Sequence, residues 1–227
     1  MEQKIPFTSY DFWAYLSAGF LLLFVIDYVG GTGVFARESW TVIQGIVAVS
    51  SAYVVGQLTA SLSSLLLERL LVGRLLGYPR MILFGKATAW RVFRALLPMY
   101  YQALPRETQE AALNQGKKFG IDKPGEALFW PAYAHARATP AVMSRLENFL
   151  NLYGFCRNIA VVGLIDSALL AISHRWYSAP AETMYLAVAL LILSLGMILR
   201  YLKFYRQFAI EAFTAFAYAE DRIGDEK

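Results

Sequence analysis

The feature that most constrains this chain is a set of long apolar blocks. They cover residues 12–35, 40–67, 156–172 and 183–199, and only 17% of the 227 residues are charged. A helix of about 20 apolar residues crosses the roughly 30 Å hydrocarbon core of a bilayer, and an average soluble protein carries roughly 25% charged residues. The sequence therefore predicts an all-α integral membrane protein with about four transmembrane helices and a helical cytoplasmic domain.

The basic residues predict how the chain is oriented. All but two of the 21 Lys and Arg residues precede the first block, lie in the segment from Arg69 to Arg157, or follow the fourth block. The two exceptions are Arg37 and Arg175, one in each short turn. Because Lys and Arg accumulate on the cytoplasmic side of bacterial membrane proteins, we expect a multi-pass protein of the bacterial inner membrane with both termini in the cytoplasm.

These blocks divide the chain into four parts. We expect transmembrane helices 1 and 2 in residues 1–68, a cytoplasmic helical domain in 69–155, and transmembrane helices 3 and 4 in 156–203. Residues 204–227 are predicted to form a cytoplasmic C-terminal helix and a frayed tail. Pro105 and the Thr139-Pro140 pair are typical of helix starts, and Gly154 is expected to bend the chain.

Within the second block, a helical projection separates two special faces. Small residues recur at every fourth position: Ala48, Ala52, Gly56, Ala60 and Ser64. Beside them runs a polar strip of Ser50, Tyr53, Gln57 and Ser61. Small residues allow helix backbones to approach closely in lipid, so this block is expected to face protein. The strip predicts either ordinary hydrogen bonds in a helix seam or a water-filled path lined by Ser50, Gln57 and Ser61.

Two acidic residues lie inside the blocks, Asp27 and Asp166. An ionisable group within a membrane costs at least about 2.5 to 3.5 kcal/mol, so such residues are candidates for function. The alternative for Asp27 is that it reaches the outer interface. For Asp166, a carboxylate facing a lumen and a protonated carboxyl hydrogen-bonded to the second block both stay open.

In the loop, basic residues alternate with aromatic ones. Arg80, Lys86, Arg91 and Arg94 are interleaved with Trp90, Phe93, Tyr100 and Tyr101. Residues of these types just inside a bacterial membrane favour contact with lipid phosphates. An anionic nucleotide or a nucleic acid is the alternative ligand.

Signatures of catalysis are missing from the sequence. There is no metalloprotease, nucleophile-elbow or phosphate-loop motif, and the single Cys156 excludes an internal disulfide and a multi-cysteine metal site. His135 and His174 are expected on opposite sides of the membrane. We therefore predict no enzyme activity, no cofactor and no metal.

Residues 10–20 (YDFWAYLSAGF) and 147–158 (ENFLNLYGFCRN) look like segments of small bacterial membrane proteins. The overall layout resembles membrane effectors of anti-phage defence systems, which join a few spans to a small helical sensor. This resemblance implies a homo-oligomer that permeabilises the inner membrane, and it transfers no functional residue.

Three hypotheses follow for the function. The first is a homo-oligomeric ion channel or membrane-permeabilising effector, gated through its cytoplasmic helical domain by a ligand or protein and acting in antiviral defence. The second is a membrane scaffold that recruits a soluble cytoplasmic partner. The third is a small solute or lipid transporter.

Overall fold

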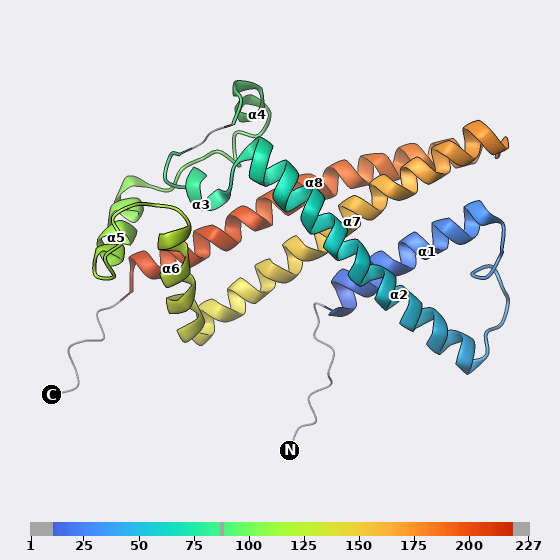
Figure 1. Cartoon of the computed structure of the whole chain (residues 1–227), viewed down its shortest axis with the longest axis horizontal. Coiled ribbons are helices and arrows are strands. Elements are labelled where there is room, and N and C mark those ends of the chain that lie inside the picture. Colours follow the sequence, from blue (N-terminus) through green and yellow to red (C-terminus); the bar gives the residue numbers. More distant parts are fainter. Residues whose placement is uncertain (1–10, 87–88, 220–227) are drawn as a thin grey trace, which may run out of the picture. The chain divides into compact units, whose positions relative to one another are not determined.

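The computed structural model describes residues 11–86 and 89–219, and within them every regular element is a helix (Figure 1). The all-α prediction is therefore confirmed for this part of the chain. The predicted frayed tail, residues 220–227, lies outside the described residues. In chain order the elements are η1 (Asp11–Leu16), α1 (Ser17–Gly30), α2 (Val42–Ser63), η2 (Ser64–Leu76), α3 (Pro79–Ile82), α4 (Arg91–Leu96), α5 (Arg106–Lys117), α6 (Glu126–Ala138), α7 (Pro140–Tyr177) and α8 (Ala181–Ala217).

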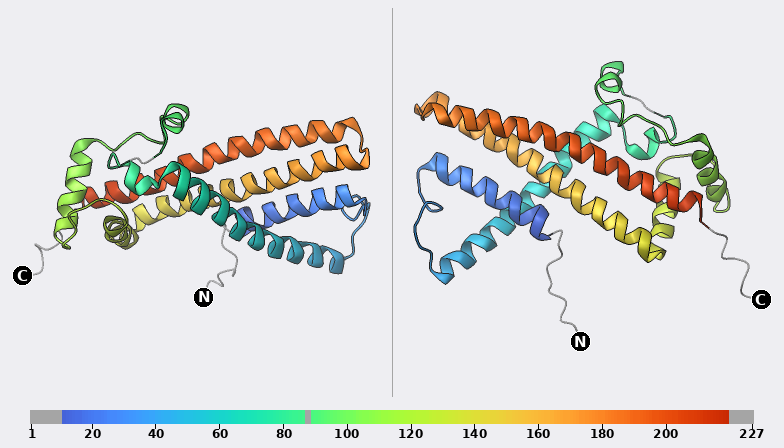
Figure 2. Two further views of the ribbon diagram at one scale, coloured as in Figure 1. Left: turned by 45° about the horizontal axis from the view of Figure 1, so that its top comes forward. Right: turned by 180° about the vertical axis from the view of Figure 1, so that it is seen from behind.

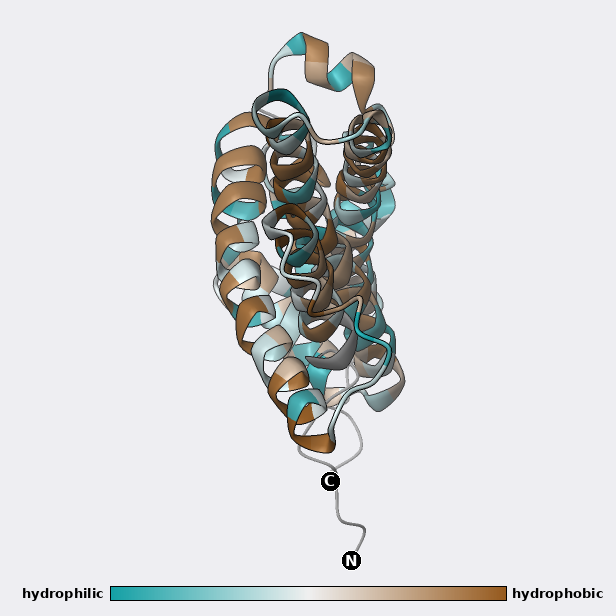
Figure 3. Cartoon of the chain, turned by 90° about the vertical axis from the view of Figure 1, so that its right-hand side faces the viewer, coloured by the Kyte–Doolittle hydropathy of each residue, from teal (hydrophilic) through white to brown (hydrophobic). Residues whose placement is uncertain are grey.

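Among the described residues, three helical stretches are long and apolar enough to cross a membrane. They are Val42–Ile82, Pro140–Tyr177 and Ala181–Ala217, and the apolar helix Ala14–Gly30 is shorter. Apolar residues, brown in Figure 3, run along the long helices. The chain therefore has the composition of a membrane protein with at least three candidate spans.

The first helix ends earlier than the apolar block from which it was predicted. Gly31 adopts a left-handed conformation with φ 64° and caps α1 after Gly30. Its N–H donates to Tyr28 O, and the N–H of Thr32 donates to Asp27 O at 3.2 Å. This glycine-terminated arrangement is a common helix stop. Residues 31–35 therefore belong to a loop, although they are apolar enough to extend the block.

Two further expectations concern the long helices. The continuation of α2 through η2 stops at Gly77, which has φ 88°, directly before the Pro79 that begins α3. By contrast, α7 continues without a break through Gly154, where a bend was predicted. A glycine inside a helix costs only about 1 kcal/mol relative to alanine, which packing readily offsets.

The described chain forms two compact units. Unit 1 contains the chain up to Arg69 and Asn151–Leu202, and unit 2 contains Leu70–Leu150 and the chain from Lys203. These boundaries fall within a few residues of those drawn from the sequence. Each unit has its own core.

Unit 1 is built around the crossing of α1 and α2 (Figure 2). A Cβ on Gly19 would overlap the Ala52 carbonyl, and a Cβ on Gly56 would overlap the Tyr15 carbonyl. The two backbones are thus in direct contact. The helix α7 adds two apolar clusters, one around Ala18, Ile159 and Val162 and the other around Val25, Leu170 and Ala187.

Unit 2 has a core of larger side chains. One cluster contains the aromatic rings Phe84, Phe213 and Phe216 together with Leu104 and Leu128. The rings of Phe84 and Phe213 meet edge to face at 5.0 Å. Buried aromatic and leucine side chains supply the largest apolar areas available to a core, so rings and leucines dominate the packing of unit 2.

Candidate functional site

The polar strip of α2, Ser50, Tyr53, Gln57 and Ser61, lies on a side of the helix that unit 1 leaves largely open. Ser50 and Ser61 are exposed, whereas Tyr53 and Gln57 are half-buried. Gln57 Nε2 donates to Tyr53 Oη at 3.1 Å, and the Tyr53 ring meets Tyr15 edge to face. The strip is therefore ordered within one chain and still presents hydroxyl and amide groups outward.

The neighbouring small-residue face of α2 contacts α1. Ala52, Gly56 and Ala60 are buried, and Ala48 and Ser64 at its two ends are half-buried. Backbone contact at Gly56 and Ala52 brings the two helices together at the middle of this face. The two faces predicted from the sequence thus differ in the structure: α1 covers the small residues, and the polar strip stays accessible.

Asp166 is fully buried in unit 1, and neither of its carboxylate oxygens has a hydrogen-bond partner among the described residues. It shares a face of α7 with Val162 and Leu170, which belong to the two apolar clusters with α1. The carboxyl therefore lies between two apolar layers. Within this single chain it faces neither an open path nor a hydrogen-bonding group of α2.

Asp27 organises the loop between α1 and α2. Its carboxylate accepts hydrogen bonds from the Thr32 hydroxyl, from the Val34 N–H at 2.8 Å and from the Phe35 N–H at 3.1 Å. The side chain is only 9% exposed. These donors would otherwise be unsatisfied loop groups, so the position of Asp27 has a structural cause. The sequence did not reveal this role because the donors come from a loop without helical periodicity.

A buried polar network, not anticipated from the sequence, joins three helices of unit 1. Asn158 on α7 accepts a hydrogen bond from the Ser63 hydroxyl at 2.6 Å and donates to the Ala14 carbonyl at 2.9 Å. Beside it, Arg157 forms an ion pair with Glu68. Because a polar group left unpaired in a bilayer costs several kcal/mol, this network specifies the register of η1, α2 and α7.

Serine hydroxyls also link α7 to α8. Ser167 Oγ donates to the Ala187 carbonyl at 2.8 Å, and Ser194 Oγ donates to the Ala160 carbonyl at 2.6 Å. Such side chain to backbone bonds are typical of helix contacts in membranes. Both serines are buried, so they hold the helices together and are closed to a ligand.

The four predicted basic residues lie in unit 2 and differ in their surroundings. Arg80 forms an ion pair with Glu126 at 3.3 Å and lies over the Tyr78 ring. Lys86, Arg91 and Arg94 are exposed. Around the last two lies what we term the α4 surface, which combines Arg91 and Arg94 with the strongly exposed apolar side chains Trp90, Leu96 and Met99.

Two adjacent tyrosines hold the end of η2 within unit 2. Tyr100 Oη donates to the Gly77 carbonyl at 2.9 Å, and Tyr101 Oη donates to the Leu76 carbonyl at 3.0 Å. Burial raises the pKa of the Tyr100 phenol above its ordinary value, with smaller contributions from Tyr205 and Tyr101. Burial also raises the pKa of Tyr101. Both groups therefore stay neutral hydrogen-bond donors at physiological pH.

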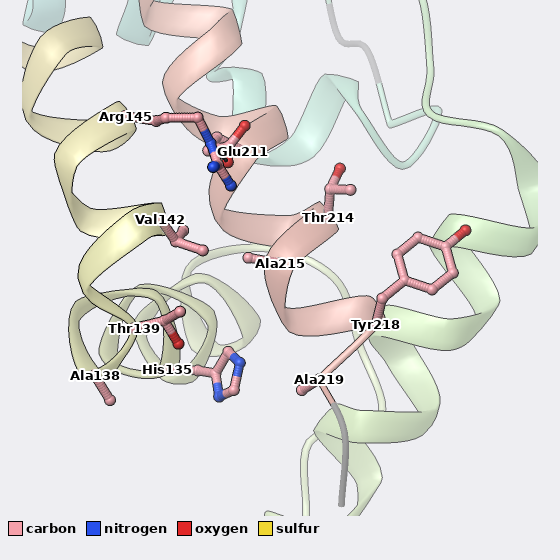
Figure 4. Close-up of a pocket in the computed structure, with 10 residues that line it drawn as sticks. All are labelled: His135, Ala138, Thr139, Val142, Arg145, Glu211, Thr214, Ala215, Tyr218 and Ala219. Atoms are coloured by element: carbon pink, nitrogen blue, oxygen red, sulfur yellow. Dashed lines mark hydrogen bonds and ion pairs between the residues drawn. The ribbon is translucent and has the colours of Figure 1, made fainter.

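Unit 2 also contains a pocket of about 580 Å³ between α6, α7 and α8. Figure 4 shows His135 from α6 and the Arg145–Glu211 pair between α7 and α8 around it, with Thr139 and Tyr218 at its edges. Arg145 Nε lies 2.6 Å from Glu211 Oε1. The pocket has the size of a small-molecule site, and His135 is a lining residue that sequence reasoning did not assign to a ligand.

The remaining candidate residues do not come together in a metal or catalytic site within the described part of the chain. Among the described residues, no three His, Cys, Asp or Glu side chains are grouped to hold a metal. His174 Nδ1 lies 2.8 Å from the Ala179 carbonyl in the turn before α8, and Cys156 is buried. Both have local structural explanations.

Comparisons with protein families, with curated proteins and with solved structures find no match for this chain.

Proposed function

We propose that this chain is an inner-membrane protein of bacteria with four spans and with both termini and unit 2 in the cytoplasm. The added span is η1 with α1: from Asp11 to Gly30 this helix rises about 30 Å at 1.5 Å per residue, enough to cross a hydrocarbon core. Its direct backbone contact with α2 supports placing both in the same solvent. The distribution of basic residues supports the orientation.

Within that membrane, the proposed function is a homo-oligomeric channel or membrane-permeabilising effector. The polar strip of α2 carries this proposal. Only 17% of the most apolar window of Val42–Ile82 is buried, and the strip lies on this open helix. Polar side chains facing lipid are unfavourable, whereas they are stabilised against another helix or water. Copies arranged around an axis would place Ser50, Gln57 and Ser61 at their contacts or along a path.

Unit 2 is the proposed gate, and a role in anti-phage defence is the proposed setting. What supports a gate is that unit 2 has its own core and a pocket lined by His135, Arg145 and Glu211. A separate domain of this kind can bind a ligand or a protein and alter the membrane helices. Such binding changes conduction only if the ligand prefers one of two states.

The test is dye release and conductance from liposomes that contain the purified chain, with oligomer size measured by native mass spectrometry. We expect release by the wild type and a strong loss with Ser50→Leu combined with Gln57→Leu. The control is Val54→Leu, because Val54 is an exposed residue of α2 outside both the strip and the groove between α1 and α2. A monomer that releases no dye, or release that the double variant leaves unchanged, contradicts the proposal.

Asp166→Asn provides a separate test of the path. Because Asp166 lies inside unit 1 and not on the open strip, conduction through the strip predicts little change in the release of dye. A selective loss of release with Asp166→Asn, at unchanged oligomer size, would instead place the path beside α7.

A second candidate function, a scaffold for a soluble partner, is favoured by the α4 surface. Trp90 and Met99 expose 76% and 77% of their area beside Arg91 and Arg94. Exposed aromatic, methionine and arginine side chains are enriched at protein interfaces. This function predicts no dye release, stable co-purification of one partner, and loss of that partner on Arg91→Glu with Arg94→Glu. The control reversal Lys118→Glu lies on another exposed part of unit 2.

A further inference from the structure

A groove lies between α1 and α2 on the loop side of their crossing. Its volume is about 400 Å³, and its apolar lining includes Leu23 and Ile26 from α1, Ile43 and Val47 from α2, and Phe35 and Trp40 from the loop. Its polar and charged lining residues are Asp27, Thr32, Arg37, Gln44 and Ser51. The groove is therefore mostly apolar, and most of its polar groups come from the loop and the residues beside it.

The geometry of the two helices holds this groove open. Gly19 and Gly56 fix the crossing by backbone contact, and from there α1 and α2 diverge toward the loop (Figures 1 and 2). The loop itself is held by Asp27, whose carboxylate accepts two of its backbone N–H groups. A capping box between Thr41 and Gln44 fixes the start of α2. The groove is thus formed by ordered parts of the chain.

The depth of the groove corresponds to one leaflet of a bilayer. From the start of α2 at Val42 to the crossing at Ala52 the helix rises about 15 Å, half of the roughly 30 Å hydrocarbon thickness. Trp40, at the open end, has the amphipathic ring that is enriched at the head-group level. An occupant that enters from the loop side therefore meets head-group depth first and the bilayer centre last.

Among the described residues, Arg37 is the one basic side chain that lines the groove, and it is the candidate partner for an anionic group. Arg37 is exposed and is the only Lys or Arg between Gly30 and Glu68. Asp27 also lines the groove and interacts electrostatically with Arg37, but its carboxylate already accepts three hydrogen bonds from the loop. Glu38 is exposed. The Arg37 guanidinium can therefore meet a phosphate in bidentate fashion.

We propose that this groove binds one acyl chain of an anionic phospholipid, with the phosphate at Arg37. The apolar lining distinguishes this occupant from a free phosphate ion. The proposal requires unit 1 to lie in a bilayer, and it holds whether or not the protein conducts.

The experiment uses the full chain in detergent with Trp40 as the sole tryptophan, the other four being replaced by Phe. Phosphatidylglycerol with brominated acyl chains is the probe, because bromine quenches a nearby indole. We expect quenching that saturates at one lipid per chain and that excess inorganic phosphate does not reverse. Quenching that rises without saturation, or that inorganic phosphate reverses, overturns the proposal.

Variants locate the site. Ala48→Phe and, separately, Val47→Phe fill the groove and should abolish the saturable quenching, whereas Val54→Phe adds the same ring on an exposed part of α2 outside the groove and should leave it intact. Two filling variants are used so that a folding defect in one does not decide the result. Equal quenching in all three variants overturns the proposal.

The head-group contact is tested with Arg37→Gln. We expect the concentration of brominated phosphatidylglycerol at half-quenching to rise about fivefold, the effect of one basic side chain at a lipid surface. Brominated phosphatidylcholine should be affected less. An equal change for both lipids overturns the assignment of Arg37. Dye release is measured in parallel, because loss of release with intact lipid binding would contradict the channel alone.

Discussion

Unit 1 and unit 2 are both helical, but side chains of different size hold them together. In unit 1 the closest contacts are made by Gly19 and Gly56, and hydroxyls such as Ser194 Oγ reach backbone carbonyls on neighbouring helices. In unit 2 the core is filled by rings, among them Phe84 and Phe213. Close backbone approach and polar links are what bind helices in lipid, whereas large apolar side chains drive association in water. The two units thus differ in how their helices are held together, as expected if only unit 1 lies in the membrane in the proposed arrangement.

The largest change in stability is expected when an aromatic ring is removed from the core of unit 2. Phe213→Ala should lower the free energy of unfolding by about 3–5 kcal/mol, because Phe213 is fully buried and the surrounding residues cannot fill the cavity. The measurement is thermal and chemical unfolding in detergent, followed by near-UV circular dichroism. Met99→Ala, at a side chain that is 77% exposed, is the control. Equal losses for the two variants would mean that unit 2 has no aromatic core.

Adding a side chain at a close helix contact should lower the stability of unit 1. Gly56→Ala adds one methyl group where the Tyr15 carbonyl already lies, so α1 and α2 must separate at a cost of about 1–3 kcal/mol. Gly45→Ala is the matched control in the same helix, because its Cβ would meet nothing within 4 Å. Unfolding in mixed micelles of increasing SDS content measures both. If both glycines tolerate alanine equally, the proposed difference in packing between the units is wrong.

Alkaline pH should affect unit 2 through Tyr100. Its raised pKa means that the folded state keeps the phenol protonated at a pH where the unfolded chain, with a pKa of about 10, releases the proton. This contribution to stability is fully present below about pH 10 and is lost as pH rises through the folded-state pKa, by up to about 1.4 kcal/mol per pH unit. Tyr100→Phe should remove the larger part of that dependence, because the pKa of Tyr101 is also raised by burial.

The readout for Tyr100 is unfolding by urea at a series of pH values, together with tyrosinate absorbance. Tyr185→Phe, at an exposed position, should leave the alkaline loss unchanged. An alkaline loss that is as large in Tyr100→Phe as in the wild type would show that another group is responsible.

The smallest expected effect concerns the ion pair between Arg80 and Glu126. The Glu126 side chain is 62% exposed, and such pairs contribute about 0–1 kcal/mol. Glu126→Gln should change the stability of unit 2 within that range, and the difference should vanish in high salt. A larger and salt-resistant loss would indicate that charge, and not ring packing, holds unit 2.

The elements that could be predicted are those with local signals. The start of α5 after Pro105 and the start of α7 at Pro140 follow from residues adjacent in sequence. The end of α1 could not be placed, because Gly31 stops the helix inside an apolar run.

Among the candidate site residues, the strip and the small face of α2 follow from helical spacing alone. The partners of Asn158 and Arg157 depend instead on the relative shift of helices far apart in the chain, which no local pattern records. The setting of Asp27 depends on how a loop folds back. Residues with distant partners were therefore the ones that sequence reasoning misjudged or missed.

The hydrogen bonds of Asn158 have a consequence for how the protein assembles during synthesis. Its amide bonds a residue 144 positions earlier, and its carbonyl bonds one 95 positions earlier. In the proposed membrane arrangement, the helical hairpin of α1 and α2 is inserted into the bilayer during translation, long before Asn158 leaves the ribosome. Until then the Ala14 carbonyl and the Ser63 hydroxyl lack their final partner, so the finished arrangement forms only after the last hairpin is inserted, and truncated nascent chains should remain loosely joined.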